Sequence, residues 1–136
     1  MSRTYRFVTT VVFTWLLAAG GCVLQSGPGG ANTTAYNPND AQMRDAQIEA
    51  GSDPALVIRN ASNRTICYVQ ISPSSDSQWG PDRLGASETI LPGRIRGWRV
   101  TPGNWDVRIL DCDQNVLGEE RNVRVQGQGT VLTYSG

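Results

Sequence analysis

The sequence predicts an all-β fold: a small antiparallel β-sandwich of about seven strands that follows a signal peptide and a flexible tether. Two observations predict this fold. Residues 53–136 consist of short extended runs that are rich in β-branched and aromatic residues, as strands are. Turn signals such as Pro92-Gly93 and Pro102-Gly103 separate these runs, and no segment beyond residue 50 has a helical period.

The first expected element is a short helix over residues 40–50, which Asn39 or Asp40 would cap and Gly51 would end. A helix of about three turns is stable only when it docks on another part of the protein. Before it, residues 23–39 are rich in Gly, Ser, Asn, Thr and Pro. Such a composition buries too little apolar surface to fold, so we expect a flexible tether there.

The expected strands follow in order, and the patterns of two runs support them most clearly. Residues 65–72 are mostly β-branched or aromatic. In the run over 104–112, alternation places Trp105 and Val107 on one face, and Asp106 and Arg108 on a face that we expect to be mostly exposed. The full set of expected strands is 55–60, 65–72, 88–91, 94–101, 104–112, 116–124 in one or two pieces, and 130–135.

Residues 1–21 have the pattern of a secretory signal peptide. Arg3 and Arg6 precede an apolar run over 7–19. A run of about 13 residues is too short to span the hydrocarbon core of a bilayer as a helix. The chain therefore divides into a signal peptide (1–21), a segment with Cys22, the tether and the short helix (22–52), and the sandwich domain (53–136).

Residues 16–22, Leu-Leu-Ala-Ala-Gly-Gly-Cys, resemble the lipobox of bacterial lipoproteins. The resemblance implies cleavage before Cys22, diacylglycerol on its sulfur and an acylated new N-terminus, which together anchor a protein stably. The chain departs from the common pattern at Ala19, where the family usually has Leu. Val23 is not Asp, which in this family favours the outer membrane. The alternative is an ordinary signal peptide cut near Ala19 or Gly21, with Cys22 a plain thiol.

Two further resemblances concern the domain. The layout of residues 91–93 and 102–108, in which Pro-Gly leads into an aromatic residue and Val, is similar to transthyretin-like and carboxypeptidase-regulatory-like modules. Residues 71–85 and 111–115 resemble an uncharacterised domain of bacterial envelope proteins. These resemblances imply a sandwich fold and carry no activity or functional residue with them.

Composition excludes several classes of function. The chain has 12 basic and 12 acidic residues, all the basic ones Arg, and it has no His. Loss of Arg3 and Arg6 with the signal would leave 10 basic against 12 acidic residues, a formal charge of −2. This balance argues against nucleic-acid binding. The absence of His excludes His-dependent triads and His-ligated metals, and the acidic residues cluster in turns, so we expect no enzyme and no cofactor.

Cys67 and Cys112 are the cysteines that remain after Cys22. Both lie in expected strands and would mature in an oxidising compartment. A structural disulfide between them is the first interpretation, and two buried thiols are the alternative. A redox pair is less favoured because the chain has no Cys-x-x-Cys.

Asp111, Asp113 and Asn115 repeat the oxygen spacing that opens a calcium loop. The EF-hand pattern then fails, because Val116 stands where Gly is needed and Asn122 where Glu is needed. An irregular Ca²⁺ site is one interpretation. The other is a plain turn, in which Asp and Asn side chains bond their own backbone.

The long loop over 72–85 carries Trp79 among polar residues. Trp79 could anchor a ligand or stack on carbohydrate, or it could fold back to plug one end of the sandwich. The candidate loop residues beside it are Asp76, Asp82 and Arg83. Trp98, near Arg94 and Arg96, offers a similar choice between an anion-binding patch and ordinary strand packing.

The sequence therefore predicts a membrane-anchored envelope lipoprotein with a non-catalytic binding or structural domain. Its partners would be the membrane, through the lipid anchor, and an envelope protein or glycan. The alternative is a Ca²⁺-dependent carbohydrate-binding or adhesion module that uses the Trp79 loop and the Asp111 turn. An enzyme of unknown chemistry is the third possibility.

Overall fold

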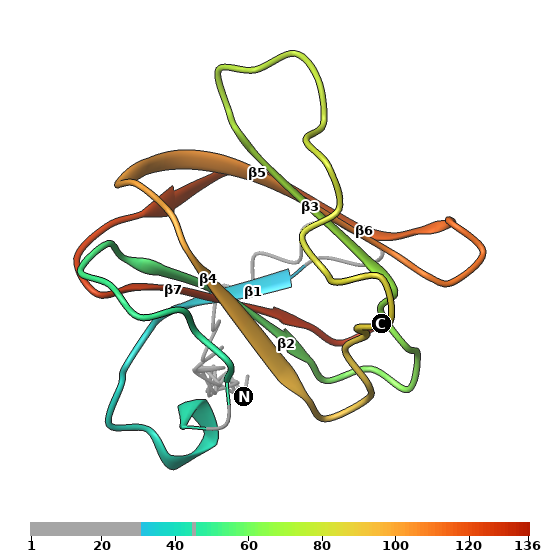
Figure 1. The fold of residues 1–136 in the computed structure, drawn as a ribbon, viewed down its shortest axis with the longest axis horizontal. Helices are drawn as coiled ribbons and strands as arrows, with labels where there is room; N and C mark the ends of the chain where they lie inside the picture. Colours follow the sequence, from blue (N-terminus) through green and yellow to red (C-terminus); the bar gives the residue numbers. More distant parts are fainter. Residues whose placement is uncertain (1–30, 45) are drawn as a thin grey trace, which may run out of the picture.

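Figure 1 shows the protein as a computed structural model, which describes residues 31–44 and 46–136. The expected signal peptide and Cys22 lie outside the described residues. Two β-sheets pack against each other, which confirms the predicted seven-stranded all-β sandwich. One sheet has the order β1 (Ala31–Ala35), β7 (Gly129–Tyr134), β2 (Ala55–Asn60), β4 (Ile95–Arg99), and the other has the order β3 (Tyr68–Pro73), β5 (Gly103–Leu110), β6 (Val116–Val125). No helix in this described part is long and apolar enough to cross a membrane.

All strand pairs are antiparallel except β2 and β7. This parallel pair begins where Gly129 lies beside Ala55. Gly129 has a φ of 132°, and a Cβ there would lie 2.1 Å from the carbonyl oxygen of Ala55. Only glycine therefore allows the two backbones to approach at the start of β7.

The main core lies between the two sheets. Alternation along each strand directs one set of apolar side chains inward, as in Leu56 and Ile58 of β2 and Val69 and Ile71 of β3. A second, smaller cluster lies on the outer face of the four-stranded sheet, where Met43 packs near Ala55, Val57 and Val131. The segment between β1 and β2 covers this outer face (Figure 1).

The N-terminal part of the described chain differs from the prediction. The tether was expected over 23–39, but residues 31–35 form β1, paired with β7. Four of its five residues are exposed, so its sequence has no alternation to reveal it. The expected helix over 40–50 is instead a 3₁₀ turn, Ala41–Met43, and the cap at Asp40 is present, because its side chain accepts a hydrogen bond from Gln42 N.

Two strand expectations are also corrected. Residues 88–91 make only an isolated bridge, between Ile90 and Ile66, and no strand. The strand expected from 65 begins at Tyr68. Both segments lie beside the edge strand β3, and the bridge between Ile66 and Ile90 is the pairing that connects them. The run over 116–124 forms one strand, with a bulge opposite Asp106.

Candidate functional site

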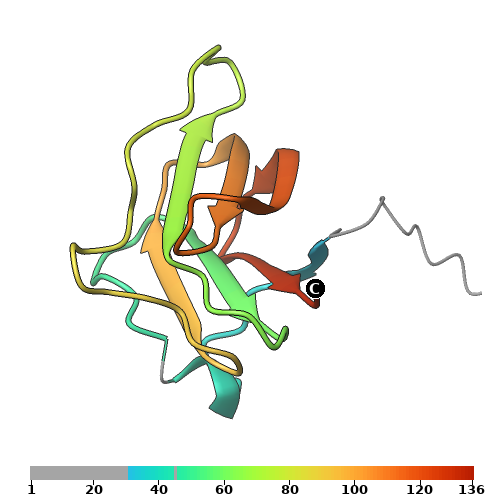
Figure 2. The same cartoon turned by 90° about the vertical axis from the view of Figure 1, so that its right-hand side faces the viewer.

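The outer face of the three-stranded sheet carries a cluster of one indole and two guanidinium groups. Trp79 comes from the loop after β3, which extends beyond the end of that strand before it turns back (Figure 2). The guanidinium carbons of Arg108 and Arg121 each lie 4.7 Å from the centroid of the Trp79 ring. These distances are those of cation–π contacts. We call Trp79, Arg108 and Arg121 the tryptophan–arginine cluster.

A bulge in β6 builds this cluster. The pairing of β5 with β6 shifts between Trp105 and Val107, so that an extra residue of β6 faces Asp106. At this bulge Asn122 has a φ of 59°, in the left-handed region, which Asn adopts more readily than most residues. The bulge brings Arg121 over the sheet face, beside Trp79.

Asp106 lies under the cluster and is buried, with 4% of its surface exposed. The prediction that its face is mostly exposed is therefore wrong at this residue. Its carboxylate accepts hydrogen bonds from Ser74 Oγ at 2.7 Å, Asn122 N at 2.8 Å and an Arg121 nitrogen at 3.1 Å. Burial raises the pKa of Asp106, but these hydrogen bonds and the charge of Arg121 outweigh burial, so the pKa lies below its ordinary value.

The two arginines of the cluster have different partners. Arg121 forms ion pairs with Glu119 and Asp106, and its hydrogen bond to Glu119 is the main reason that its pKa is raised. Arg108 donates two hydrogen bonds, of 2.8 and 2.6 Å, to the neutral Oε1 of Gln70. Among the described residues Arg108 has no ion pair. The cluster is thus a partly exposed aromatic and cationic surface with no nucleophile in it.

The other residues predicted for this loop are structural or exposed. Asp82 accepts hydrogen bonds from the backbone N–H groups of Val69 and Leu84, and Arg83 N donates to the carbonyl of Val69. Leu84, not Trp79, inserts into the core. Asp76 is exposed, and its carboxylate accepts no hydrogen bond from the described residues. The loop is therefore held by its second half, 82–84.

Trp98 is part of the core and not of a ligand surface. It is 3% exposed, and it pairs across the sheet with Leu56. Its indole N–H donates to the carbonyl of Arg83 at 3.3 Å. Arg96 lies 5.1 Å from the ring centroid and forms an ion pair with Glu88. The strand-packing interpretation accounts for Trp98.

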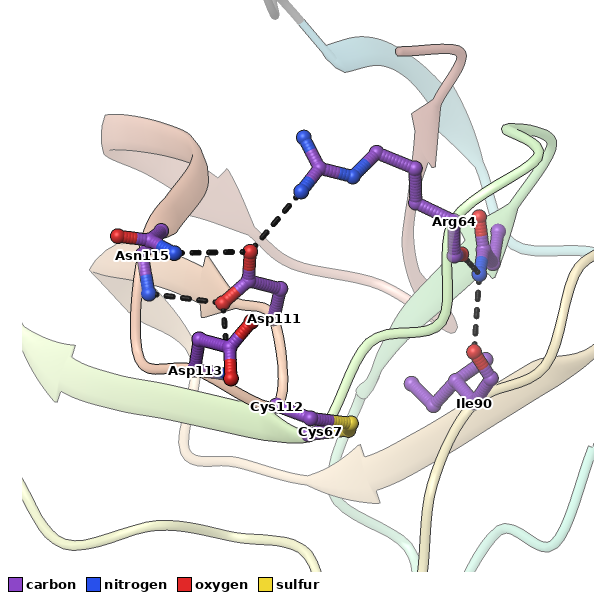
Figure 3. The surroundings of a disulfide bond; sticks show 8 residues. Arg64, Cys67, Ile90, Asp111, Cys112, Asp113 and Asn115 are labelled. Atoms are coloured by element: carbon purple, nitrogen blue, oxygen red, sulfur yellow. Dashed lines mark hydrogen bonds and ion pairs between the residues drawn. A yellow bond between two sulfur atoms is a disulfide. The ribbon is translucent and has the colours of Figure 1, made fainter.

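Figure 3 shows the disulfide and the turn next to it. Cys67 and Cys112 are bonded, which confirms the predicted bridge. The neighbouring Asp111 carboxylate accepts from Asp113 N at 2.9 Å, from Asn115 N at 2.8 Å and from Arg64 at 2.9 Å. The hydrogen bond from Asn115 N is the main cause that lowers the pKa of Asp111.

Both oxygens of the Asp111 carboxylate thus accept hydrogen bonds, mostly from its own turn. Within residues 31–44 and 46–136, no three His, Cys, Asp or Glu side chains are grouped so as to hold a metal ion. The plain-turn interpretation accounts for the Asp111, Asp113 and Asn115 spacing. The calcium-dependent alternative has no observation in its favour.

Comparison of the chain with protein-family models, with curated proteins and with solved structures gave no significant match. The chain's own residues must therefore carry any functional inference. Of these, sequence reasoning found Trp79 but missed its partners Arg108 and Arg121. Alternation did place Arg108 on the correct face, but the bulge that turns Arg121 toward the same face left no pattern in the sequence.

Proposed function

We propose that this protein is a lipid-anchored protein of the bacterial envelope whose β-sandwich binds a partner without catalysis. The observation that carries the proposal is the order of features at the N-terminus: Arg3 and Arg6, the apolar run over 7–19, and the small residues that lead to Cys22. This order resembles a lipoprotein signal, and Cys22 is the residue that would carry the lipid. Val23 makes the outer membrane the favoured location.

The start of the folded domain is compatible with such an anchor. Ala31 begins β1, nine residues after Cys22. Nine residues span at most about 30 Å when fully extended. The N–H of Ala31 donates to Glu120 Oε1 of β6 at 2.8 Å, and Ala31 pairs with Tyr134 of β7. An anchor at Cys22 would therefore be attached through Ala31 to both sheets, and it would hold the domain close to the membrane surface.

The tryptophan–arginine cluster is the surface that we propose for the partner. Trp and Arg are the residue types that most often dominate binding energy at protein interfaces. Arg121 keeps 59% of its side chain exposed although it is paired with Asp106 and Glu119. Trp79 is half-buried and already contacts Arg108 and Arg121, so little conformational entropy would be lost on binding.

The intact mass of the native protein, extracted from its own membranes, tests the anchor. We expect a chain that begins at Cys22 and is heavier than the polypeptide by two or three acyl chains. The matched control is Cys22→Ser, which we expect to remain unprocessed and without acyl chains. An unacylated native protein that begins at another residue would overturn the anchor.

The partner surface is tested by chemical cross-linking in intact cells. We expect a discrete cross-linked product for the natural protein, and loss of that product in Trp79→Ala. The control is Trp105→Ala, another half-buried indole, which lies outside the cluster. Equal cross-linking by all three proteins would exclude the cluster as the binding surface.

A further inference from the structure

A cavity of about 430 Å³ lies on the outer face of the four-stranded sheet. It is bounded by the 3₁₀ turn η1 (Ala41–Met43), by the end of β2 and by the start of β4. The end of β2 and the start of β4 lie next to each other in Figure 1. Its lining includes three polar or charged side chains that form no hydrogen bond with other described residues: Gln42, Arg59 and Arg94. Its size suits a small ligand or the head of a larger one.

The charge in this cavity is unbalanced. Among the described residues, its lining contains two arginines and no carboxylate. Neither Arg59 nor Arg94 forms an ion pair or donates a side-chain hydrogen bond within the described residues, whereas Arg64, Arg96 and Arg121 each pair with a carboxylate. Two cations in a concave site create a positive potential that attracts anions.

Arg59 carries a second, independent sign of a missing partner. Its Nε is shielded from solvent and has no hydrogen-bond partner among residues 31–44 and 46–136. A buried donor without a partner loses its hydration and gains nothing in return, so such groups are rare in native proteins. An oxyanion in the cavity would supply the missing acceptor once the Arg59 side chain turned its Nε edge toward the cavity.

Regular backbone holds both arginines in place. Alternation along β2 places Arg59 on the outer face, where it pairs with Ile95 of β4 and Thr133 of β7. Arg94 follows a tight turn whose Gly93 has a φ of 79°. Asn60 fastens this turn, since its N–H donates to the carbonyl of Arg94 and its own carbonyl accepts from Gly93 N. The backbone positions from which the two arginines extend are thus set before any ligand binds.

We propose that this cavity binds a phosphate-class oxyanion between Arg59 and Arg94. Planar guanidinium groups match the geometry of phosphate oxygens and hold them with paired hydrogen bonds. Gln42 supplies an additional amide donor at the rim of the cavity. The site is separate from the tryptophan–arginine cluster, which lies on the other sheet.

The position of the cavity indicates where the phosphate comes from. Asn60, which borders the cavity, and Ala31, from which the chain runs back to Cys22, both pair with Tyr134. The cavity and the proposed anchor therefore lie at the same end of the sheet. A phospholipid headgroup would be within reach there, and this source rests on the proposed function. Free inorganic phosphate is the other source of the same chemistry.

The test is an NMR titration of the full chain, extracted and held in a non-ionic detergent, that follows the arginine Nε–H signals. We expect inorganic phosphate to shift the Arg59 signal in a saturable manner. Arg59→Gln and Arg94→Gln should each weaken phosphate binding at least tenfold. The matched control is Arg124→Gln, at an exposed arginine whose side chain donates to Gln126, and it should change binding less than twofold.

A second titration with glycerophosphoglycerol, the water-soluble headgroup of phosphatidylglycerol, separates the sources. Binding of this diester as tightly as inorganic phosphate supports the lipid headgroup, and binding of inorganic phosphate alone supports the free ion. No saturable shift at Arg59, or equal affinity in all the variants, overturns the proposal. If Arg59→Gln fails to fold, Arg94→Gln alone decides. The mass measurement on Cys22 is independent, so the anchor can fail while the phosphate site stands.

Discussion

At the scale of single residues, Asp106 is a buried group through which pH acts on this fold. Hydrogen bonds from Asn122 and Ser74 and the charge of Arg121 outweigh the effect of burial and lower its pKa below 3.8. A lowered pKa means that the ionised carboxylate stabilises the folded state. That contribution is complete above the unfolded pKa of about 3.9 and is lost as the pH falls through the folded pKa.

We therefore expect the free energy of unfolding to fall between about pH 5 and pH 2, and part of this fall to disappear in Asp106→Asn. Urea denaturation over this range measures the effect. Asp76→Asn serves as the control, because Asp76 is exposed and its carboxylate accepts no hydrogen bond from the described residues. If Asp106→Asn and the natural protein lose stability in parallel, Asp106 is not the group responsible.

Asn60 concentrates four hydrogen bonds on one buried side chain. It is fully buried, its Nδ2 donates to the carbonyls of Arg64 and Ile90, and its Oδ1 accepts from the backbone N and Oγ of Ser62. Replacement by Ala would leave several of these groups without partners. We expect Asn60→Ala to cost about 3 kcal/mol in urea denaturation.

Asn63→Ala is the matched control for this change, because Asn63 lies in the same turn but is exposed. Its expected effect is within about 0.5 kcal/mol. A similar loss in both variants would mean that the turn itself, and not the hydrogen bonds of Asn60, carries the stability.

At the scale of elements, Leu84 is one of two buried apolar residues, with Ile90, that attach the loop between β3 and β4 to the core. Leu84 is 6% exposed and belongs to the core between the sheets. We expect Leu84→Ala to cost roughly 2–4 kcal/mol, because it removes buried surface and leaves a cavity. Leu91→Ala, at a position that is 51% exposed, should cost less than about 0.5 kcal/mol. Thermal or urea denaturation compares the two, and equal losses would show that the loop does not depend on Leu84.

The same elements show what sequence patterns can and cannot predict. Strands with alternating or continuous apolar residues, such as β2 and β5, were predicted to within one or two residues at each end. Burial of a strand face places apolar residues at a regular spacing that the sequence shows. β1 was missed, since it contributes backbone hydrogen bonds and almost no buried side chain. The expected helix over 40–50 was wrong because docking of Met43 on the sheet requires only one turn there.

The candidate sites were predictable only where a residue type is conspicuous. Trp79 and the two cysteines were found in this way. Arg59 was not, because a single Arg at the end of an apolar strand gives no sign of the cavity that Arg94 and Gln42 complete from distant positions. Such sites form only when the fold brings distant residues together, and a single sequence does not show which residues will meet.

At the scale of the whole molecule, the disulfide joins two strands of the three-stranded sheet, at the end where β3 begins and β5 ends. Cys67 precedes β3, Cys112 follows β5, and 45 positions separate them in the chain. Closing a loop of this length lowers the entropy of the unfolded chain by an amount worth about 4 kcal/mol at room temperature. For a domain of this size, that is a large fraction of the total stability.

We therefore expect the double variant Cys67→Ala, Cys112→Ala to lose about 4 kcal/mol of unfolding free energy, with little change in the folded spectrum at neutral pH. Reduction of the natural protein with dithiothreitol should lower its urea midpoint to near that of the variant, and the reductant should leave the variant itself unchanged. The bridge between Ile66 and Ile90 and the hydrogen bond from Cys67 N to Leu110 O do not involve the sulfur atoms, so we expect the fold to persist. If reduction leaves the urea midpoint of the natural protein unchanged, the disulfide does not contribute to its stability, and packing between the sheets accounts for that stability instead.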